Sequence, residues 1–428
     1  MSALYPDTYY AATRNQTITS DEFVDNQEVE TCIVGGGYAG LMTALGLVER
    51  GHTNIAIVDK HGIGYGCSGR NGGLVFAGYS LGAKALVKQV GIEKAKVLYQ
   101  FTQGAVSLIR RRVVQYTINC DLVDKGALWA NWFKDQSILH DEQAFMRDTL
   151  GVNWDYIPPE ELSHMLKSDQ YHGALFEPNA MHFHPLNYAL GVANALQKQG
   201  VKIHQECEVL DIDYQSATKQ IKTSQGTIKA KNIVVAGGGY IGDLFKPVSS
   251  SILPIATYVM TTEPLGERLL DAIQTPSAVY DTRFAFDYYR PLRDSRILWG
   301  GRIHARKAKP KDLNHILKRD MLKVFPQLEG VKVDYDWHGW MAYARHQMVQ
   351  IGEVAPNVWY NTGFGGHGVA PTTAAGEIVA AAITSENDHY KHFQPWGLPW
   401  NGGVFGPSAA QLSYWWYQLK DWWKEKTE

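Results

Sequence analysis

The chain has 428 residues, more than the roughly 250–300 residues at which a single hydrophobic core stops growing, so we expect two domains. Hydrophobic residues make up 45% of the sequence and charged residues 20%, values that are ordinary for a soluble globular protein. The formal net charge of -2 does not supply the basic field that binding to a phosphate backbone needs, so we expect no nucleic acid partner.

The four cysteines lie far apart, without a CxxC pair or a dense disulfide framework. We therefore expect reduced thiols and a cytoplasmic location. The first 26 residues are polar and acidic, unlike the basic start and apolar run of a signal peptide. No segment approaches ~20 unbroken apolar residues, so we expect no transmembrane segment. The sequence predicts no metal site.

The first patterned segment predicts a strand, a tight turn and a helix. An apolar run at 31–34 enters a glycine cluster, and a helical stretch follows at 41–49. A second buried strand is expected at 54–59, which completes a βαβ unit. Because a βαβ connection joins parallel strands, the sequence predicts a parallel sheet.

The rest of the chain alternates between this first sheet and a second one. After a glycine-rich loop at 61–73, we expect helices at 81–112, 140–149 and 187–200, followed by first-sheet strands at 201–205, 207–213 and 227–236. From about residue 247 the pattern changes to alternating strands, such as 258–261 and 286–290, which favours a mostly antiparallel second sheet. Near residue 352 the chain returns to the first domain, with a strand at 358–360 and a helix at 372–384.

The glycine cluster after the first strand fits G-x-G-x-x-G in its expected context, strand before and helix after. Gly35 permits the tight turn, Gly37 lets the backbone approach a pyrophosphate, and Gly40 lets the helix pack closely on the strand. Asp59 follows the last glycine by about 20 positions, where an acidic residue accepts the adenosine ribose hydroxyls. The motif predicts a dinucleotide site but does not separate FAD from NAD.

Three further glycine-rich segments favour FAD. The loop at 64–73 can bring backbone amides and the Ser68 hydroxyl against phosphates and a flavin ring. The run at 233–240 predicts a strand that enters another glycine turn. The run at 361–371 ends at a helix, whose unpaired amides stabilise negative charge at the N1/C2=O edge of a reduced flavin.

Together, these four segments resemble the glycine oxidase and D-amino-acid oxidase superfamily of flavoproteins, and the resemblance spans nearly the whole chain. It implies an α/β fold with a Rossmann-like FAD-binding domain of the glutathione-reductase type and a second, mostly antiparallel substrate domain. The FAD-binding domain is expected to be discontinuous, at 29–90, 150–245 and 345–390. The substrate domain takes 91–149 and 246–344, between a lead-in at 1–28 and a tail at 391–428.

The resemblance also implies which residues contact FAD. Val209 meets the adenine through its backbone, and the segment 366–370 lines the isoalloxazine. The full set of expected cofactor contacts is Gly35, Gly37, Tyr38, Ala39, Gly40, Asp59, Lys60, Ser68, Arg70, Asn71, Gly72, Gly73, Val209, Gly237, Gly365, Gly366, His367, Gly368, Val369 and Ala370.

Two departures from relatives carry information. Some relatives attach the flavin to a histidine in the loop that here reads 70–73, and others to a cysteine in the segment that here reads 339–341; this chain has neither residue, so we expect non-covalent FAD. Glycine oxidase-like members hold the substrate carboxylate with an arginine where this chain has Met341. A carboxylate buried against methionine lacks a charge partner, so an amine whose anionic group lies farther from the reacting nitrogen is expected.

The implied reaction is oxidation of the carbon–nitrogen bond of a small primary or secondary amine, such as γ-glutamylputrescine. Hydride transfer to flavin N5 is followed by hydrolysis of the imine, and oxygen or another acceptor takes the electrons. Catalytic candidates are His182, Tyr258, Arg302 and His367. Arg290 and Tyr289 are further candidates for the substrate pocket. His182 and His184 are equally compatible with structural roles, Arg302 with an exposed position and both tyrosines with sheet packing. The basic cluster at 302–307 either attracts an anionic substrate or is a solvated charge run.

The last segment has apolar residues at helical spacing, and most such helices dock on their own protein. Attachment to a membrane surface or a dimer contact is also compatible with these residues, and we expect a monomer or a homodimer. The shared face consists of Leu412, Trp415, Trp416, Leu419, Trp422 and Trp423.

Three alternatives stay open from sequence. The same chemistry acts on N-alkyl amino acids or N-alkylated aminophosphonates. The βαβ fingerprint also occurs in NAD(P)-dependent dehydrogenases, although these would leave the loop 68–73 and the turn 363–368 without a role. A non-enzymatic or membrane-associated flavoprotein would use the tail as a partner contact.

Overall fold

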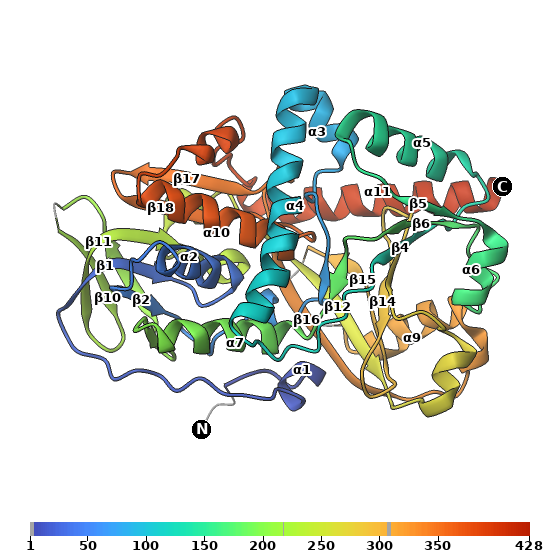
Figure 1. Cartoon of the computed structure of the whole chain (residues 1–428), viewed down its shortest axis with the longest axis horizontal. Coiled ribbons are helices and arrows are strands. Elements are labelled where there is room, and N and C mark those ends of the chain that lie inside the picture. The colour runs from blue at the N-terminus through green and yellow to red at the C-terminus, as the bar shows by residue number, and fades with distance from the viewer. Residues whose placement is uncertain (1–3, 217, 306–309) are drawn as a thin grey trace.

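The computed structural model describes residues 4–216, 218–305 and 310–428. Within these ranges the chain forms two lobes, each built on one eight-stranded sheet. Figure 1 shows the first sheet on the left, the second on the right and one long helix between them. A further two-stranded sheet joins Leu74–Val75 (β3) to Met181–His182 (β7).

The first sheet has a parallel centre. Its order is β17-β18-β11-β1-β2-β8, and all pairs from β18 to β8 are parallel, whereas β17 pairs with β18 in the antiparallel sense. Two more strands form an antiparallel meander that continues from β11. The bounds are β1 Gln27–Val34, β2 Ile55–Val58, β8 Lys202–His204, β9 Val209–Asp213, β10 Lys219–Thr223, β11 Thr227–Val235, β17 Gln350–Ala355 and β18 Val358–Thr362.

The central strands are apolar on both faces because both faces are covered. Ile33 of β1 packs in a core with the helices Tyr38–Val48 (α2), Ile92–Gln115 (α4), Pro185–Lys198 (α7) and Val369–Ile383 (α10). Its neighbours Cys32 and Val34 point to the other face, where β9, β10 and the short helix Lys246–Ser249 (α8) pack. The period of two along β1 therefore divides its side chains between two cores.

The helices on the first face are in close contact. A Cβ on Gly376 of α10 would lie 2.6 Å from backbone and side-chain atoms of Met42 in α2, so the two helices approach as glycine alone permits. Arg112 of α4 is fully buried and donates to both Glu49 oxygens, at 3.0 and 2.7 Å, and to Glu377 of α10. This ion-pair network ties α4 to the first lobe.

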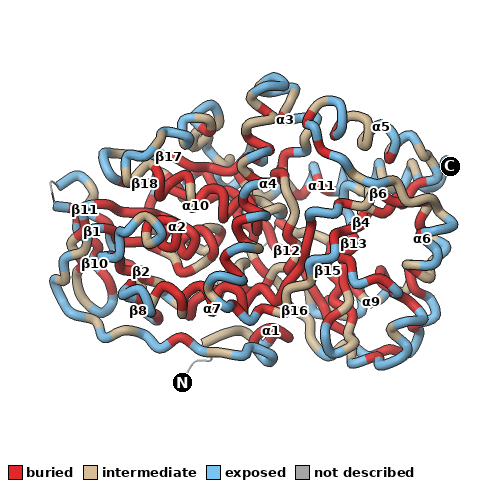
Figure 2. Tube along the Cα trace, in the orientation of Figure 1, coloured by how far each residue is buried: buried red, intermediate tan, exposed pale blue. Residues whose placement is uncertain are grey.

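The second sheet is mostly antiparallel, as predicted; only β13 and β4 pair in the parallel sense among its described strands. One face packs on Leu313–Val324 (α9), and the other contributes Val259, Leu298 and Trp337 to the core of the first lobe. The buried interior therefore continues from one lobe to the other (Figure 2). In order, the strands are β16 Val333–Tyr343, β12 Leu253–Thr262, β15 Ile297–His304, β14 Tyr288–Pro291, β13 Ala278–Asp281, β4 Ala127–Ala130, β6 Ala174–Glu177 and β5 Asp155–Ile157.

The α/β fold with two sheets agrees with the sequence prediction, while the packing differs from the predicted segment boundaries. Helix α4 falls within the predicted substrate segment but packs on α10 and α2, because its buried face is apolar and Arg112 pairs with both helices. Conversely, β5 and β6 fall within the predicted FAD-binding segment but pair with β4 in the second sheet. Helix α10 also begins at Val369, earlier than the predicted 372.

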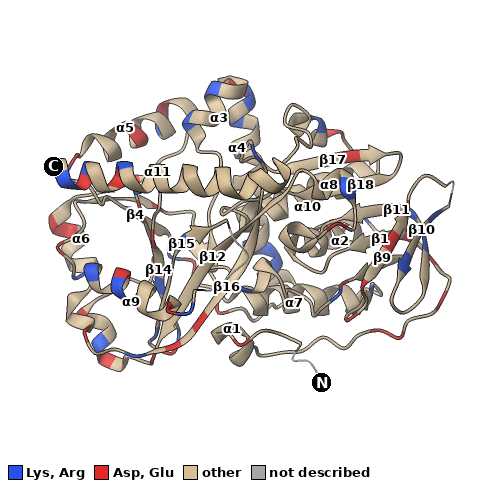
Figure 3. Cartoon of the chain, turned by 180° about the vertical axis from the view of Figure 1, so that it is seen from behind, with Lys and Arg blue, Asp and Glu red and all other residues tan. Residues whose placement is uncertain are grey.

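The C-terminal helix Gly406–Thr427 (α11) runs across the back of the second lobe (Figure 3). It docks through a stripe that is partly polar: Gln411 accepts from the Ala305 amide, the Tyr414 hydroxyl accepts from the Ile303 amide, and Asp421 accepts from the Ala285 amide. The apolar face predicted from its spacing points outward, each side chain being at least half exposed: Leu412, Trp415, Trp416, Leu419, Trp422 and Trp423.

Charged residues of both signs are interspersed on α9, α11 and Ser137–Phe145 (α5) in Figure 3. Among the described helices, none is both long enough and apolar enough to cross a bilayer. The remaining described α-helices are Tyr9–Ala12 (α1), Ala83–Val90 (α3) and Pro159–Met165 (α6), and a π-helical turn at Met146–Leu150 extends α5.

Candidate active site

The four glycine segments meet at one edge of the first sheet. The strands β18, β11, β1 and β2 are parallel, so the turns that follow them all lie at the carboxyl edge, where open α/β sheets bind ligands. The turns are in direct contact: the Gly35 amide donates to Val58 O at 2.9 Å, and the Ala236 amide donates to Val34 O at 2.8 Å. Segments far apart in sequence therefore form one continuous surface.

The first turn has the geometry that a dinucleotide requires. Gly35 has φ +117°, and a Cβ there would lie 2.6 Å from Ala236 O. A Cβ on Gly40 would lie 2.0 Å from Gly35 O, and one on Gly37 would lie 3.0 Å from Ser68 Oγ. Any side chain would fill this cradle, so the site fits the pyrophosphate of FAD at the N-terminus of α2. In the first turn of α2, the Tyr38 amide donates to Ser68 Oγ at 2.9 Å.

Asp59 stands at the end of β2 as predicted, and the candidate adenine contact lies beside it. Its carboxylate accepts from the amides of Gly36 at 2.7 Å and His61 at 2.8 Å. Burial raises the pKa of Asp59 to about 6, against the effect of these two hydrogen bonds. The Asp59 carbonyl accepts from the Cys207 amide at 2.8 Å, which brings Val209 to the same place. Lys60 pairs with Glu208 at 2.7 Å, and both side chains are exposed.

Arg70 and Asn71 contact protein groups in the structure. The Arg70 guanidinium donates to Tyr240 Oη at 2.6 Å and to His338 O at 3.1 Å, and its side chain lies over the rings of Tyr65 and Tyr240. Asn71 Nδ2 donates to Ser68 O at 2.9 Å. These bonds fix the glycine loop against β16. Both side chains therefore position the loop, whether or not they also contact the cofactor.

A buried cation supports the same loop from below. Arg290 is 3% exposed and donates to Gly72 O at 2.7 Å and to Phe183 O at 2.8 Å, while its Nη1 lies 3.2 Å from His182 Nδ1. Among the described residues, no carboxylate lies within ion-pair distance of it. Arg290 therefore holds the carbonyls of the loop, and its positive charge favours an anionic ligand above. These contacts give Arg290 a role in supporting the glycine loop.

His182 is buried and hydrogen-bonded to other parts of the protein. It is 1% exposed, and its Nε2 lies 2.8 Å from Pro276 O. Burial, assisted by the charge of Arg290, lowers the pKa of His182 to about 3, so the ring is neutral near pH 7. His184 is also buried and accepts from the Asn187 amide at the start of α7. Both histidines therefore make hydrogen bonds of the kind that a structural role requires.

The turn before α10 offers free amides, as the sequence predicts for the flavin edge. No side chain caps this helix, so the first-turn amides of Val369 and Ala370 lack helical partners. Gly365 has φ +61°, and the His367 amide donates to Ser80 Oγ at 3.1 Å. Beside Gly366, a Cβ would lie 3.4 Å from Met341 Sδ, so β16 forms the next wall. The glycine turn at 237–239 touches the same strand, since a Cβ on Gly239 would lie 2.9 Å from Trp340 O.

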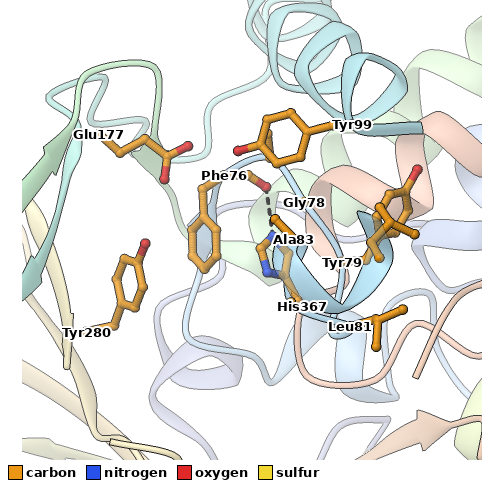
Figure 4. Close-up of a pocket in the computed structure, with 12 residues that line it drawn as sticks. Phe76, Gly78, Tyr79, Leu81, Ala83, Tyr99, Glu177, Tyr280 and His367 are labelled. Atoms are coloured by element: carbon orange, nitrogen blue, oxygen red, sulfur yellow. Dashed lines mark hydrogen bonds between the residues drawn. The ribbon is translucent and has the colours of Figure 1, made fainter. Parts of the chain in front are cut away.

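A cavity of about 160 Å³ adjoins this turn. His367 faces it, with Nε2 3.1 Å from Phe76 O, and burial lowers the pKa of His367 to about 4. Figure 4 shows Phe76, Tyr99 and Tyr280 around the cavity and the carboxyl group of Glu177 reaching into it. The segment 76–86, α4, β6, β13 and the turn before α10 all contribute to the lining.

The other catalytic candidates lie elsewhere in the second lobe. Arg302 forms a bidentate pair with Asp320 of α9, with Nη2 2.8 Å from Oδ1. Tyr258 is 3% exposed in the core of the second sheet, and burial raises its pKa to about 12. Tyr289 is fully buried and stacks on Trp299 at 4.6 Å, so it packs within that core. Of the basic cluster at 302–307, residues 306 and 307 lie outside the described ranges.

Comparison with known proteins identifies the family that this geometry belongs to. The family model described as FAD dependent oxidoreductase (DAO) matches residues 30–382. The chain belongs to the DAO family of FAD-dependent oxidoreductases. It is 32% identical over 391 residues to gamma-glutamylputrescine oxidoreductase from Escherichia coli, with 91% of each chain covered, and 31% identical over 422 residues to probable oxidoreductase OrdL from Haemophilus influenzae, with 97% of each covered.

Solved structures of the DAO family share the fold. Glycine oxidase from Bacillus cereus superposes with a TM-score of 0.72 at 18% identity, covering 87% of this chain and 98% of that one. L-Amino acid deaminase from Proteus myxofaciens superposes with a TM-score of 0.74 at 18% identity, covering 90% and 96%. The cofactor of the family is FAD, which removes the NAD(P) alternative. The four turns have the geometry that would hold this cofactor.

Apart from His367, the polar and aromatic residues of the cavity were missed by sequence reasoning. Phe76, Tyr99, Glu177 and Tyr280 belong to four separate segments, and none lies in a glycine motif. The one local signal is Glu177, a carboxylate that ends the apolar strand β6. A charged residue at the buried end of a strand is a reason to look for a ligand there.

Proposed function

We propose that the chain oxidises the carbon–nitrogen bond of a small primary or secondary amine, such as γ-glutamylputrescine, with non-covalent FAD as the oxidant. Bound FAD supplies the acceptor for a hydride equivalent. The protein binds the neutral amine, orients its C–H bond and excludes water until the imine is released to hydrolyse. The identity with gamma-glutamylputrescine oxidoreductase over 91% of both chains supports this substrate class.

The observation that carries the proposal is the methionine beside the flavin turn. Met341 Sδ lies 3.4 Å from the position of a Cβ on Gly366, where a substrate α-carboxylate would need an arginine. No lining residue of the adjacent cavity is Lys or Arg, and the low pKa of His367 keeps its ring uncharged. An N-alkyl amino acid or an aminophosphonate would bring an anionic group that this lining does not neutralise.

The sequence of the glycine loop and the state of the cysteines support two further parts of the proposal, the non-covalent binding of FAD and a cytoplasmic location. The residues at 70–73 include no histidine and those at 339–341 no cysteine, which supports dissociable FAD. All four cysteines are free, and three of them are buried. Free thiols favour a cytoplasmic location, because reducing compartments keep them so.

The test is anaerobic mixing of the purified yellow protein with γ-glutamylputrescine, with 1-butylamine and with glycine, followed by the visible flavin absorbance. We expect bleaching by the amines and little by glycine. Acid precipitation of the protein should leave the flavin in the supernatant. Bleaching by glycine alone, or by no amine at all, would refute the proposal. Oxygen consumption in air then separates an oxidase from a dehydrogenase.

A further inference from the structure

The cavity beside His367 has the chemistry of a cation site. Its twelve lining residues include four aromatic rings, counting Tyr79, one carboxylate and one neutral imidazole, and no basic side chain. Apolar walls of low dielectric strengthen any charge interaction inside them. Glu177, when it is ionised, therefore gives this cavity a negative field.

Glu177 is a buried carboxyl group with spare bonding capacity. It is 5% exposed, and its Oε2 has no hydrogen-bond partner. Leaving a buried polar atom unpaired costs about 1–3 kcal/mol, and more for a charged group, so a ligand that pairs with this oxygen would remove that cost. Figure 4 shows the carboxyl group directed to the cavity.

The aromatic rings are arranged around that carboxyl group. Phe76 and Tyr280 stack face to face, with centroids 5.1 Å apart and an interplanar angle of 2°, and His367 meets Phe76 edge-on at 4.2 Å. Besides burial, the charge of Glu177 raises the pKa of both Tyr99 and Tyr280, so both hydroxyl groups lie near it. Ring faces carry the negative end of a quadrupole, and rings beside a carboxylate attract an ammonium group.

We infer that the cavity binds a second, non-reacting ammonium group of the amine substrate, with Glu177 as its counter-ion and the surrounding rings as its walls. This inference rests on the proposed function, because it identifies which amines that site selects. The substrate is then an amine with a second cationic nitrogen: a diamine, or an amide of a diamine whose acyl part carries an ammonium group of its own.

The order of the rings from the flavin turn to Glu177 indicates how far the second ammonium group lies from the reacting carbon. His367 belongs to the flavin turn, Phe76 contacts His367, and Tyr280 stacks on the far side of Phe76. Glu177 and Tyr280 lie on the opposite side of the Phe76 ring from His367 (Figure 4). A nitrogen held by Glu177 is separated from the flavin turn by about one ring layer, which a short alkyl chain spans.

Binding depends on the ionisation of Glu177, because the cation pairs with the carboxylate. Burial raises the pKa of Glu177 to about 8, and a hydrogen bond from the Ala77 backbone opposes the rise. The ionisable groups that face it are Tyr99 from α4, Tyr280 from β13 and His367 from the turn before α10, with Glu142 of α5, paired to Lys84 at 2.7 Å, just beyond. A permanently charged ligand should therefore bind more tightly as the pH rises toward 8, by up to about tenfold per unit.

The kinetic test compares 1-butylamine, 1,4-diaminobutane and γ-glutamylputrescine on the holoenzyme. We expect at least one substrate with a second nitrogen to exceed 1-butylamine in kcat/KM by about tenfold or more. Glu177→Gln should raise KM for that substrate by a similar factor, leave kcat within about twofold and leave 1-butylamine nearly unchanged. The matched control is Glu142→Gln, which removes a nearby carboxylate outside the lining and should change KM little. Equal use of all three amines by the wild type, or an equal loss on all three in E177Q, would overturn the inference.

A binding test does not depend on turnover. Choline and its uncharged isostere 3,3-dimethylbutan-1-ol are titrated into oxidised holoenzyme by calorimetry between pH 6 and 8. We expect choline to bind more tightly than the alcohol, increasingly so with pH, and E177Q to remove the difference. Equal binding of the two ligands overturns the cation site. If choline binds in this way but no amine bleaches the flavin, the site stands and the proposed amine oxidation fails.

Discussion

At the scale of single residues, the structure separates side chains that look equivalent in sequence. His182, His367, Arg290 and Arg302 each stand near a turn or strand end, and of these four His367 lines the cavity beside the flavin turn. The position of a residue in the sequence indicates that its side chain is a candidate for catalysis, but not which side chain it will contact in the fold. Asp320 lies 18 positions from Arg302 and pairs with it through a helix of the second lobe, a contact that no local pattern encodes.

Glu177 gives a prediction for stability. Burial raises its pKa from 4.5 to about 8 in the folded protein, whereas an unfolded glutamate titrates near ~4.3. The folded state therefore holds the proton more tightly, and this contribution is fully present below about pH 4.3 and is lost as the pH rises through 8. The free energy of unfolding of the wild type, relative to Glu177→Gln, should fall by on the order of 3 kcal/mol between pH 5 and 8.

Urea unfolding of wild type and E177Q at both pH values, with saturating FAD and no amine, measures this difference. Other titrating groups cancel because they are common to both proteins. A difference in unfolding free energy that does not change with pH would contradict a raised pKa at Glu177.

At the scale of elements, the first βαβ unit could be predicted from the sequence because each of its glycines is required by a contact within the unit or next to it. Gly40 belongs to α2, and its Cα faces β1, where a Cβ would lie 2.0 Å from Gly35 O and 3.0 Å from Ile33 Cγ2. Gly104 belongs to α4, is exposed and has nothing within 4 Å of its Cβ position. The two glycines form a matched pair for the same substitution.

Gly40→Ala should push α2 away from β1, destabilise the protein by about 1–3 kcal/mol and reduce the flavin bound per protein. Gly104→Ala should stabilise it by about 0.5–1 kcal/mol, since alanine loses less backbone entropy in a helix. Thermal unfolding and the ratio of flavin to protein absorbance report both effects. Equal behaviour of the two variants would mean that the close approach at Gly40 is not required.

Helix α11 shows where element-scale prediction ends. Its period of 3.6 correctly groups the tryptophans on one face, but the docked face is the other one. The reason is hydrogen bonding: the amides of Ala285, Ile303 and Ala305 find acceptors on Asp421, Tyr414 and Gln411, and buried amides need such partners. Hydrophobic periodicity carries no information about these contacts.

At the scale of the whole molecule, the convergence of the four turns was predictable and the cavity was not. The strands before these turns are parallel, and parallel strands bring their turns to one edge wherever they occur in sequence, so the four glycine segments predict one shared surface. The cavity instead needs five segments from both lobes, among them Phe76, Glu177 and Tyr280. Their meeting depends on how the two sheets pack, which follows from the shared core and from no motif.

The same packing predicts that FAD binding stabilises both lobes as one unit. Arg70 belongs to the glycine loop of the flavin site, and its guanidinium donates to His338 O of the second sheet and to Tyr240 Oη after β11. Trp337 Nε1 donates to Arg70 O at 2.9 Å from the same strand of the second sheet. At FAD concentrations of about 100 Kd the stabilisation is ~2.7 kcal/mol, which for a chain of this length corresponds to a shift in Tm of roughly 3 °C.

We therefore expect a single thermal transition that moves upward with FAD. Arg70→Met removes two hydrogen bonds from a charged donor, each contributing about 1.5–3 kcal/mol, so Tm should fall by roughly 3–7 °C and FAD should bind more weakly. Arg293→Met is the control, because that side chain is 81% exposed and its ion pair with Asp121 is open to solvent. The measurement is calorimetry of the three proteins with and without FAD. A second transition whose Tm does not change with FAD would show that the lobes unfold separately. Equal Tm values for R70M and R293M would show that Arg70 does not couple the lobes.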